Sequence, residues 1–415
     1  MNKTVLIICD FFPCPGTDGR SAYLLDIVDY LALNSFAVKL CVLSDTPNGT
    51  VPWYLAPAKL ADKADISIIG NQRLGKRFFI RFNLRNWALA LPCIIYRRLP
   101  SFLHNFMGKL VTRQRGEVSH FMVKSGSAAF VNDLLRNEHP DTLIFNHSRL
   151  AALKEKLELP EKALTGVIAH DVMHRRHQSF AASGIDVDSR EVMSMAEEKA
   201  ALAKFDFIIA IQEDDAGVFK EMLPESTVIT APMSTSFPAD AVPPAKRIVP
   251  GRCLIVGGYG QPNIDSFNWF LRDVWPGVYS GNPAACLHVC GNVCRALQAP
   301  DGMNISLLGR IEDLSREYEE AELCVIPLLA GSGLKIKLIE ALKYNCRCVS
   351  TSWGVQGIRT PEKYGITVAD TAGAMADAIL SATQSHSGND GQRFFEDFSP
   401  ENCYGELVEL MQRRM

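Results

Sequence analysis

A basic residue behind a loop of small residues is the first feature of this sequence that could do chemistry. An apolar stretch, residues 324–328, leads into a small-residue loop, residues 330–333, and then into a helical pattern that carries Lys335 and Glu340. Such a loop lets the N–H groups and the dipole of the following helix face an anion. We place Lys335 in the first helical turn, where a cation suits a phosphate better than it suits the helix. Glu340 is too far from Lys335 to be its helical ion pair, and could bind the vicinal hydroxyls of a sugar.

A second polar cluster follows the apolar stretch that ends at Ala169. His170 and Asp171 come directly after it, and further cationic or titratable side chains follow within six residues: His174, Arg175, Arg176 and His177. Arginine binds phosphate and carboxylate well. Three histidines could also suggest a metal, but no further ligand is evident. The alternative is a solvated loop that holds these residues by chance.

The chain begins with a strand–loop–helix–strand pattern. Residues 4–10 and 37–43 are apolar runs typical of buried strands, and residues 21–33 have helical spacing. This order predicts a doubly wound parallel sheet, in which ligands gather at the carboxyl ends of the strands. The first loop, which contains Gly16, Asp18 and Gly19, would then border a site, although a plain turn explains it equally well.

Three longer motifs lie in the second half: G-x-I-x-D-L-x-x-x-Y-x-x-A from Gly309, G-S-G-L-K-I-K-x-x-E-A-L from Gly331 and S-T-x-x-G-x-x-G from Ser350. Together with the strand that ends at Pro327, they resemble the C-terminal half of family-4 retaining glycosyltransferases of GT-B fold. The resemblance covers residues 251–382 well and the N-terminal half loosely. It implies an α/β protein with two Rossmann-like, doubly wound parallel-sheet domains that face each other across a cleft.

The domain boundaries follow from the resemblance and from composition. Residues 1–235 would form the acceptor-side domain and residues 251–385 the nucleotide-sugar domain. Residues 236–250 are rich in proline and predict the linker. In GT-B proteins the last helix commonly crosses back, so we expect residues 386–415 to pack on the first domain.

The resemblance also assigns roles to individual residues. The donor would bind to a set of residues from the second domain: Gly258, Arg310, Ile311, Ser332, Gly333, Leu334, Lys335 and Glu340. Catalysis would fall to Asp171, with His170 as its rival against the transferred sugar, and to Lys335 at the diphosphate. The loop of Gly16, Asp18 and Gly19 would face the donor across the cleft.

This chain departs from the family pattern at three positions. Ser332 stands where many members have the first of two glutamates, and Gly258 and Asn263 stand where many have arginine and lysine. The phosphate role would therefore fall to Lys335, aided by Arg310 or Lys337. Since Lys337 is about 200° around a helix from Lys335, the two can face one phosphate only if the helix starts late. The motif from Gly258 lacks the third glycine of a dinucleotide fingerprint, which counts against an NAD-dependent oxidoreductase.

Residues 66–116 contain ten lysines and arginines and no acidic residue, in a chain whose net charge is −3. Aromatic residues are interleaved with the basic ones, a mixture typical of surfaces that contact anionic lipid headgroups. The candidates for a membrane or acceptor surface are Arg77, Arg81, Arg85, Trp87, Arg97 and Arg98. The alternative is a pair of ordinary helices whose arginines bond to acidic partners elsewhere. Nothing else in the chain favours nucleic acid.

Composition limits the compartment and the cofactors. The twelve cysteines lie largely in apolar runs, where cysteine acts as a small buried hydrophobe, so we expect a reducing compartment. No run is long enough to cross a membrane. We therefore expect a cytoplasmic protein, possibly peripheral on the inner face of the membrane. His288, Cys290 and Cys294 lack a fourth ligand, so we expect no metal and no cofactor.

These features predict a glycosyltransferase that moves a sugar from a nucleotide-sugar to a glycan, a lipid-linked acceptor or another acceptor. The resemblance implies that configuration is retained and that no metal is needed. Two alternatives stay open: a GT-B epimerase or hydrolase that consumes nucleotide-sugar without an acceptor, and a non-catalytic nucleotide-sugar-binding protein, which Ser332 in place of glutamate would suit.

Overall fold

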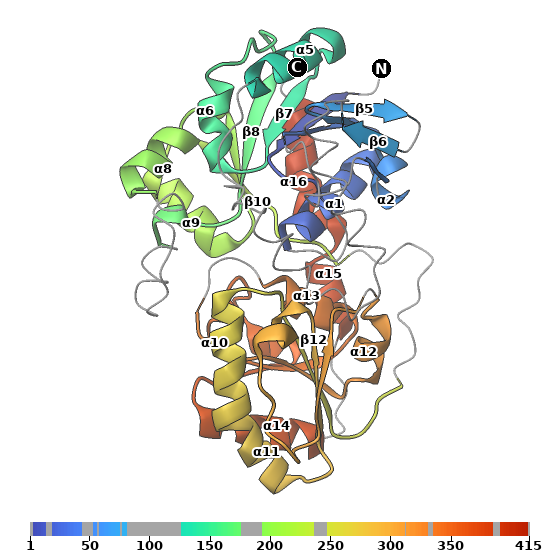
Figure 1. The fold of residues 1–415 in the computed structure, drawn as a ribbon. Helices are drawn as coiled ribbons and strands as arrows, with labels where there is room; N and C mark the ends of the chain where they lie inside the picture. The colour runs from blue at the N-terminus through green and yellow to red at the C-terminus, as the bar shows by residue number, and fades with distance from the viewer. Residues whose placement is uncertain are drawn as a thin grey trace.

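The protein has two α/β domains joined by two crossings of the chain (Figure 1). The computed structural model describes residues 3–13, 19–43, 53–55, 58–74, 77–80, 126–175, 193–235, 247–311, 313–330, 335–384 and 391–413. The predicted linker, residues 236–250, lies mostly outside these ranges. Each domain is built on its own parallel sheet, as the sequence predicts.

The first domain contains a seven-stranded parallel sheet in the order β10-β9-β8-β7-β1-β2-β4. Its strands are β1 (Thr4–Cys9), β2 (Ala37–Val42), β4 (Ala64–Ile68), β7 (Thr142–Phe145), β8 (Leu164–Ala169), β9 (Phe207–Ala210) and β10 (Thr227–Thr230). The central strands are unbroken apolar runs that are buried on both faces, which is why they do not alternate with polar residues. Helices cover both faces: α1 (Gly19–Leu33), α2 (Ala58–Ala61), α5 (Ser127–Glu138), α6 (Ala151–Lys154), α8 (Met195–Leu202) and α9 (Glu213–Met222).

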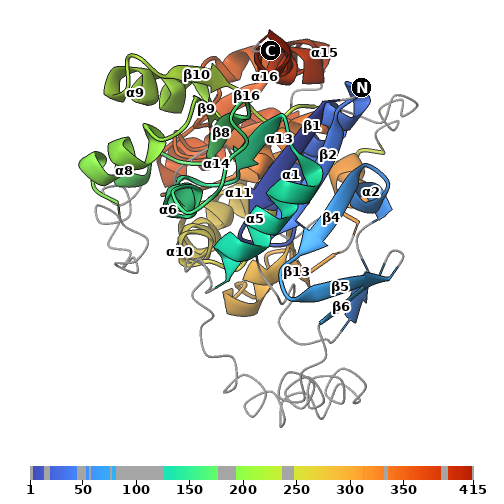
Figure 2. The same cartoon turned by 90° about the horizontal axis from the view of Figure 1, so that it is seen from above.

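A small antiparallel sheet extends the first domain beyond β4, on the side away from β8 and β9 (Figure 2). It consists of β3 (Trp53–Leu55), β5 (Asn71–Leu74) and β6 (Arg77–Ile80). The alternative of two helices for residues 66–116 is therefore wrong for its described part, where the aromatic-rich β6 pairs with β3 and β5. Arg73 forms an ion pair with Asp65. Most of the basic segment, from residue 81 onward, lies outside the described residues.

The second domain contains a six-stranded parallel sheet in the order β13-β12-β11-β14-β15-β16. Its strands are β11 (Arg252–Val256), β12 (Cys286–Cys290), β13 (Ile305–Gly309), β14 (Leu323–Ile326), β15 (Arg347–Ser350) and β16 (Ile366–Val368). Helices α10 (Gln261–Trp269), α11 (Trp275–Gly281) and α14 (Ala372–Gln384) enclose one apolar cluster around the buried Trp275. Helices α12 (Ser315–Glu320) and α13 (Ile336–Lys343) cover the opposite face.

Two glycines allow β11 and β12 to end side by side at the edge that faces the first domain. Gly291 has φ +108°, and a Cβ atom there would lie 2.0 Å from the carbonyl oxygen of Gly257. No other residue type fits this backbone conformation and this close approach. The strand ends therefore stay free of side-chain bulk where a ligand would approach.

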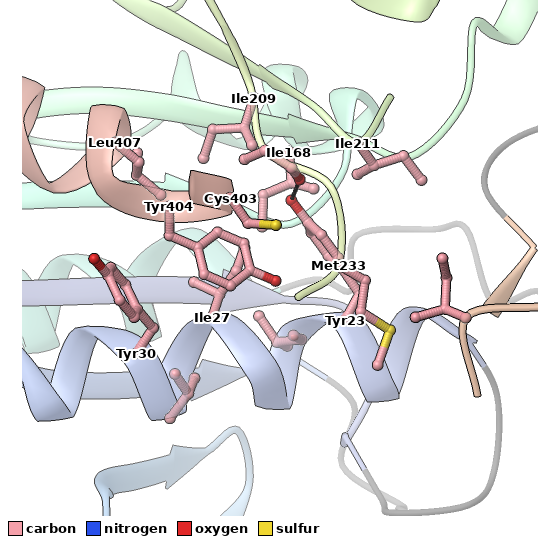
Figure 3. Close-up of a cluster of buried hydrophobic side chains, with 14 of the residues drawn as sticks. Tyr23, Ile27, Tyr30, Ile168, Ile209, Ile211, Met233, Cys403, Tyr404 and Leu407 are labelled. Atoms are coloured by element: carbon pink, nitrogen blue, oxygen red, sulfur yellow. Dashed lines mark hydrogen bonds between the residues drawn. The ribbon is translucent and has the colours of Figure 1, made fainter. Parts of the chain in front are cut away.

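The C-terminal segment returns to the first domain. Helices α15 (Gly391–Asp397) and α16 (Pro400–Arg413) follow α14, and α16 lies beside α1 (Figure 1). Tyr404 of α16 packs against Tyr23 and Tyr30 of α1, within the apolar cluster of Figure 3. Lys3 donates hydrogen bonds to the carbonyl groups of Met411 and Gln412, where a cation suits the helix end.

A buried carboxyl group holds the C-terminal segment against the first domain. Asp26 accepts a hydrogen bond from the Tyr404 hydroxyl at 2.6 Å and another from the backbone N–H of Ser234 at 2.7 Å. One residue further on, the backbone N–H and the hydroxyl of Thr235 donate to the Phe398 carbonyl. The two segments that cross between the domains are therefore bonded to each other and to α1.

Replacing Tyr404 with Phe removes one hydrogen bond to the buried Asp26 carboxylate. Because bonds to charged groups contribute about 1.5–3 kcal/mol, we expect the free energy of unfolding to fall by about that amount. Tyr30→Phe is the matched control: its hydroxyl bonds to Glu401, which lies at the surface, so the loss should be under about 1 kcal/mol. Urea denaturation of both variants measures the difference, and equal losses would contradict this role for Asp26.

Candidate active site between the domains

A cavity of about 230 Å³ lies where the two sheets face each other. Gly19, at the start of α1, lines it from the first domain, and Lys335, Ile336, Lys337 and Tyr318 line it from the second. A Cβ atom at Gly19 would lie 2.7 Å from the Ile336 side chain, so the beginnings of α1 and α13 touch across the cavity. The structure therefore brings part of the predicted first loop against the predicted phosphate site.

Lys335 precedes the helix instead of lying in its first turn, so that detail of the prediction is wrong. Helix α13 starts at Ile336, and Lys335 is its N-cap with an extended backbone and no side-chain capping bond. The Lys335 side chain is 9% exposed, and its Nζ donates a hydrogen bond to Gln356 Oε1 at 3.3 Å. Because the helix starts late, Lys335 and Lys337 both line the cavity. Two lysines and a helix N-terminus thus border the same cavity, an arrangement suited to a phosphate.

Glu340 lies in the same helix, about one turn after its start, and next to Tyr318. The Tyr318 hydroxyl donates a hydrogen bond to Glu340 Oε2 at 3.2 Å. Burial raises the pKa of Tyr318 well above its ordinary value, so this hydroxyl stays protonated and a donor. The Tyr318 ring is stacked on Tyr344, with ring centroids 5.0 Å apart. Tyr318 therefore fixes the position of the Glu340 carboxylate, which the sequence assigned to a ribose.

His170, at the carboxyl end of β8, is buried in the first domain. Its Nε2 lies 2.8 Å from Oδ1 of Asn146, which follows β7, and its ring meets the edge of Tyr23. Burial, assisted by the Arg20 charge, lowers the pKa of His170 to about 3. The imidazole is therefore neutral at physiological pH. It can orient a hydroxyl through a hydrogen bond, but it is a weak base.

One carboxyl group that the sequence analysis did not single out is influenced by the charges of both Asp171 and Lys335. This group is Asp215, in the first turn of α9, and it is 8% exposed. The pKa of Asp215 is raised to about 7, mainly by burial; a hydrogen bond with the Gln212 side chain and the Lys335 ammonium lower it, and the Asp171 and Asp214 carboxylates raise it. The charges of Asp171, on the first domain, and of Lys335, on the second, thus both act on Asp215.

A buried glutamate of α8 holds the turn that follows His170 and Asp171. Glu198 is fully buried and accepts hydrogen bonds from the backbone N–H groups of Met173 and His174, and its Oε2 lies 2.7 Å from Nδ1 of His174. His174 is thus part of this internal network. Sequence analysis missed Glu198, because 24 residues separate it from His174 and only the fold brings them together.

The other predicted donor residues are spread along the carboxyl edge of the second sheet. Gly258 follows β11 and its carbonyl accepts a hydrogen bond from Asn263, while the exposed Arg310 and the partly buried Ile311 follow β13. Arg77 lies in β6. The remaining residues lie outside the described parts of the chain: Gly16, Asp18, Ser332, Gly333, Leu334, Arg81, Arg85, Trp87, Arg97 and Arg98.

The described residues contain no cluster of three or more side chains that could hold a metal ion. His288, the imagined ligand, instead bonds through Nδ1 to Glu317 at 2.7 Å. The ten cysteines within the described ranges are all free thiols, and eight of them are buried. In these same ranges, none of the helices has the length and hydrophobicity that crossing a membrane requires.

Glu198→Ala should loosen the turn after Asp171. The change leaves two buried N–H groups without an acceptor, at about 1–3 kcal/mol each, so we expect a loss of about 2–6 kcal/mol in the free energy of unfolding. Glu198→Gln keeps one acceptor oxygen and should lose less. Lys199→Ala, one position later on the exposed face of α8, is the control. Chemical denaturation ranks the three variants, and a Glu198→Ala loss no larger than the control would refute the positioning role.

Comparison with known proteins finds a family model that matches the second domain and solved structures with a similar fold. Residues 250–385 match the family model of glycosyl transferases group 1. An uncharacterised 44.6 kDa protein from the cps region of Klebsiella pneumoniae is 29% identical over 146 residues, which cover 32% of this chain and 38% of that protein.

Solved structures match the chain over nearly its whole length at low sequence identity. Sucrose-phosphate synthase from Thermosynechococcus elongatus has a TM-score of 0.62 at 14% identity, over 99% of both chains. TarM from S. aureus, in a complex with fondaparinux, α-GlcNAc-glycerol and UDP, has a TM-score of 0.64 at 10% identity, over 99% of both chains. HepE from Anabaena, in complex with UDP and glucose, has a TM-score of 0.57 at 12% identity and the same coverage. The chain therefore has the GT-B fold, and residues 250–385 of its second domain are similar to the glycosyl transferases group 1 family.

Proposed function

We propose that this protein is a glycosyltransferase that moves a sugar from a nucleotide-sugar to a glycan or lipid-linked acceptor. The cavity between the domains carries the proposal. Lys335, Lys337 and the start of α13 offer positive charge on one wall, and the Glu340 carboxylate follows one helical turn later. A nucleoside diphosphate presents the matching groups: two phosphates and, a few ångströms away, the vicinal hydroxyls of a ribose.

The comparisons support a nucleotide-sugar as the donor. The family model covers the same residues that form the cationic wall and the Glu340–Tyr318 pair. Among the structural neighbours, HepE was solved with UDP and glucose, and TarM with UDP. The base and the sugar that this chain binds are left open by these residues.

The proposed reaction begins with departure of the nucleoside diphosphate. As the glycosidic bond breaks, negative charge grows on the leaving phosphate, and Lys335 and the uncapped N–H groups of α13 stabilise it. Preorganised charge of this kind is worth roughly 10²–10³ in rate for each donor removed. On the opposite side, neutral His170 orients the sugar and Asp171 supports the cationic character that develops on it. We propose retention of configuration on the basis of the family resemblance.

Lys335→Ala should lower turnover by roughly 10²–10³, because the growing phosphate charge loses its nearest cation. The free energy of unfolding should fall by no more than about 1.5–3 kcal/mol, because Lys335 makes no capping bond to α13 but donates a hydrogen bond to Gln356. Lys343→Ala, in the last turn of the same helix, is the matched control and should keep full activity. Release of free nucleotide from a panel of nucleotide-sugars gives the rate, and thermal melting gives the stability. Unchanged turnover in Lys335→Ala would refute the proposed site.

The same assay separates this function from its alternatives. A transferase releases nucleotide faster when a lipid-linked or glycan acceptor is added, whereas an epimerase or hydrolase consumes nucleotide-sugar at the same rate without one. A binding protein retains nucleotide and releases none. Each outcome other than acceptor-dependent release contradicts the transferase.

We also propose that the reaction needs no metal ion, because lysine side chains supply the charge that offsets the diphosphate. Treatment with EDTA should then leave acceptor-dependent turnover unchanged. A fall in turnover that Mg²⁺ or Mn²⁺ restores would show that a cation shares the phosphate role with Lys335.

A further inference from the structure

Two residues at the start of α9 each have a buried polar atom without a hydrogen-bond partner in the protein. Gln212 and Asp215 are 6% and 8% exposed, and Oε1 of Gln212 and Oδ2 of Asp215 have no hydrogen-bond partner. Leaving a buried polar atom unpaired costs about 1–3 kcal/mol. Such a cost is usually explained by a ligand or by function.

A third atom of this kind lies at the same edge of the sheet. Asn146, which is 1% exposed, follows β7, and its Nδ2 has no partner. Strands β7, β8 and β9 are neighbours, so Asn146, His170 and Gln212 follow three adjacent strand ends. Together they offer an amide N–H, an amide oxygen and a carboxyl oxygen. Only a ligand that both donates and accepts hydrogen bonds can satisfy all three, and hydroxyl groups do this.

The charges around Asp215 exclude a phosphate on this side of the cleft. The carboxylates of Asp171 and Asp214 both act on Asp215, and Lys335 is the cation that offsets them. A diphosphate therefore belongs on the Lys335 side, while an uncharged polyhydroxyl ring fits beside Asp215. Carboxyl and amide side chains with two acceptor positions bind neighbouring hydroxyls of such a ring well.

The start of α9 also contacts the second domain. Arg359, in the loop after β15, forms ion pairs with Glu213 and with Asp214, the latter at 3.8 Å. All three side chains are more than half exposed, and exposed ion pairs contribute only about 0–1 kcal/mol. The contact therefore contributes little to holding the two domains together.

We propose that Asp215, Gln212 and Asn146 form a subsite on the first domain that binds the hydroxyl groups of the acceptor sugar. This rests on the proposed function, which it deepens by naming a sugar ring as the part of the acceptor that is recognised. The three residues contact the acceptor, and the donor stays on Lys335 and Glu340. The subsite uses one described edge of the first sheet and none of the residues assigned to the donor.

The test compares carboxyl groups one position apart on α9. Ligand-detected NMR measures the binding of glucose, galactose, mannose and N-acetylglucosamine to protein saturated with UDP. We expect the wild type to bind at least one of them, Asp215→Ala to weaken that binding at least tenfold, and Asp215→Asn, which keeps one acceptor oxygen, to lie between. Asp214→Ala, at the exposed neighbour, should bind as the wild type does. UDP affinity, from calorimetry, should stay within twofold in every variant.

The pH dependence of the protein's stability gives a second test of the environment of Asp215. Asp215 has its pKa raised from 3.8 to about 7 in the folded protein, so the folded state holds this proton more tightly than the unfolded state. Stability is therefore lost as the pH rises through this window, and it stays lost above it. Asp215→Asn removes that cost. Its Tm relative to the wild type should rise between pH 5 and pH 8, whereas the difference for Glu221→Gln, at an exposed position in the last turn of α9, should not.

Three results would overturn the subsite. They are sugar binding in Asp215→Ala equal to that of the wild type, no binding of any of the four sugars to the wild type, and a loss of UDP affinity that parallels the loss of sugar binding. Failure of the proposed function looks different. In that case the wild type shows no acceptor-dependent release of nucleotide, whatever Asp215 does. If release occurs and Asp215→Ala keeps its full rate and acceptor KM, only the subsite is wrong.

Discussion

The contact of Gly19 with Ile336 sets how closely the two sheets can face each other. Any side chain at position 19 would lie 2.7 Å from Ile336, so the beginnings of α1 and α13 meet only because the first has no Cβ atom. The cavity beside this contact is lined from both domains. The proposed reaction depends on this spacing. The lysines of the second domain and the polar strand ends of the first can act on one substrate only if they lie within reach of each other.

The return of the C-terminal helix keeps the two domains as one unit. Asp26 is bonded to Tyr404 and to Ser234, and Thr235 is bonded to Phe398, so both crossings of the chain are fixed at one place. In contrast, the ion pairs of Arg359 near the cavity are exposed and weak. The interface thus combines a buried attachment with an exposed contact that adds little to its stability.

Much of the fold and part of the site could be predicted from sequence. Unbroken apolar runs such as β8 and β14 identify buried parallel strands, and Lys335 and His170 stand out because they follow such runs. The start of α13 was misplaced because the capping position is decided by backbone conformation, which Lys335 does not signal. Strands β5 and β6 were also missed as strands. Asp215 and Glu198 could not be found as site residues, because their burial comes from elements far away in sequence; a run of acidic residues after β9 was the only signal for Asp215.

Helix α13 begins at a residue that caps helices poorly. Serine, threonine, aspartate and asparagine are the residues that best satisfy the first N–H groups of a helix, and their replacement costs about 0.5–2 kcal/mol. A lysine stands there instead, with no side-chain bond to the backbone. Selection for thermal stability alone would replace it with one of these four residues. The choice of a lysine at position 335 therefore records a requirement that conflicts with the durability of the fold, and position 335 is where stabilising design should be avoided.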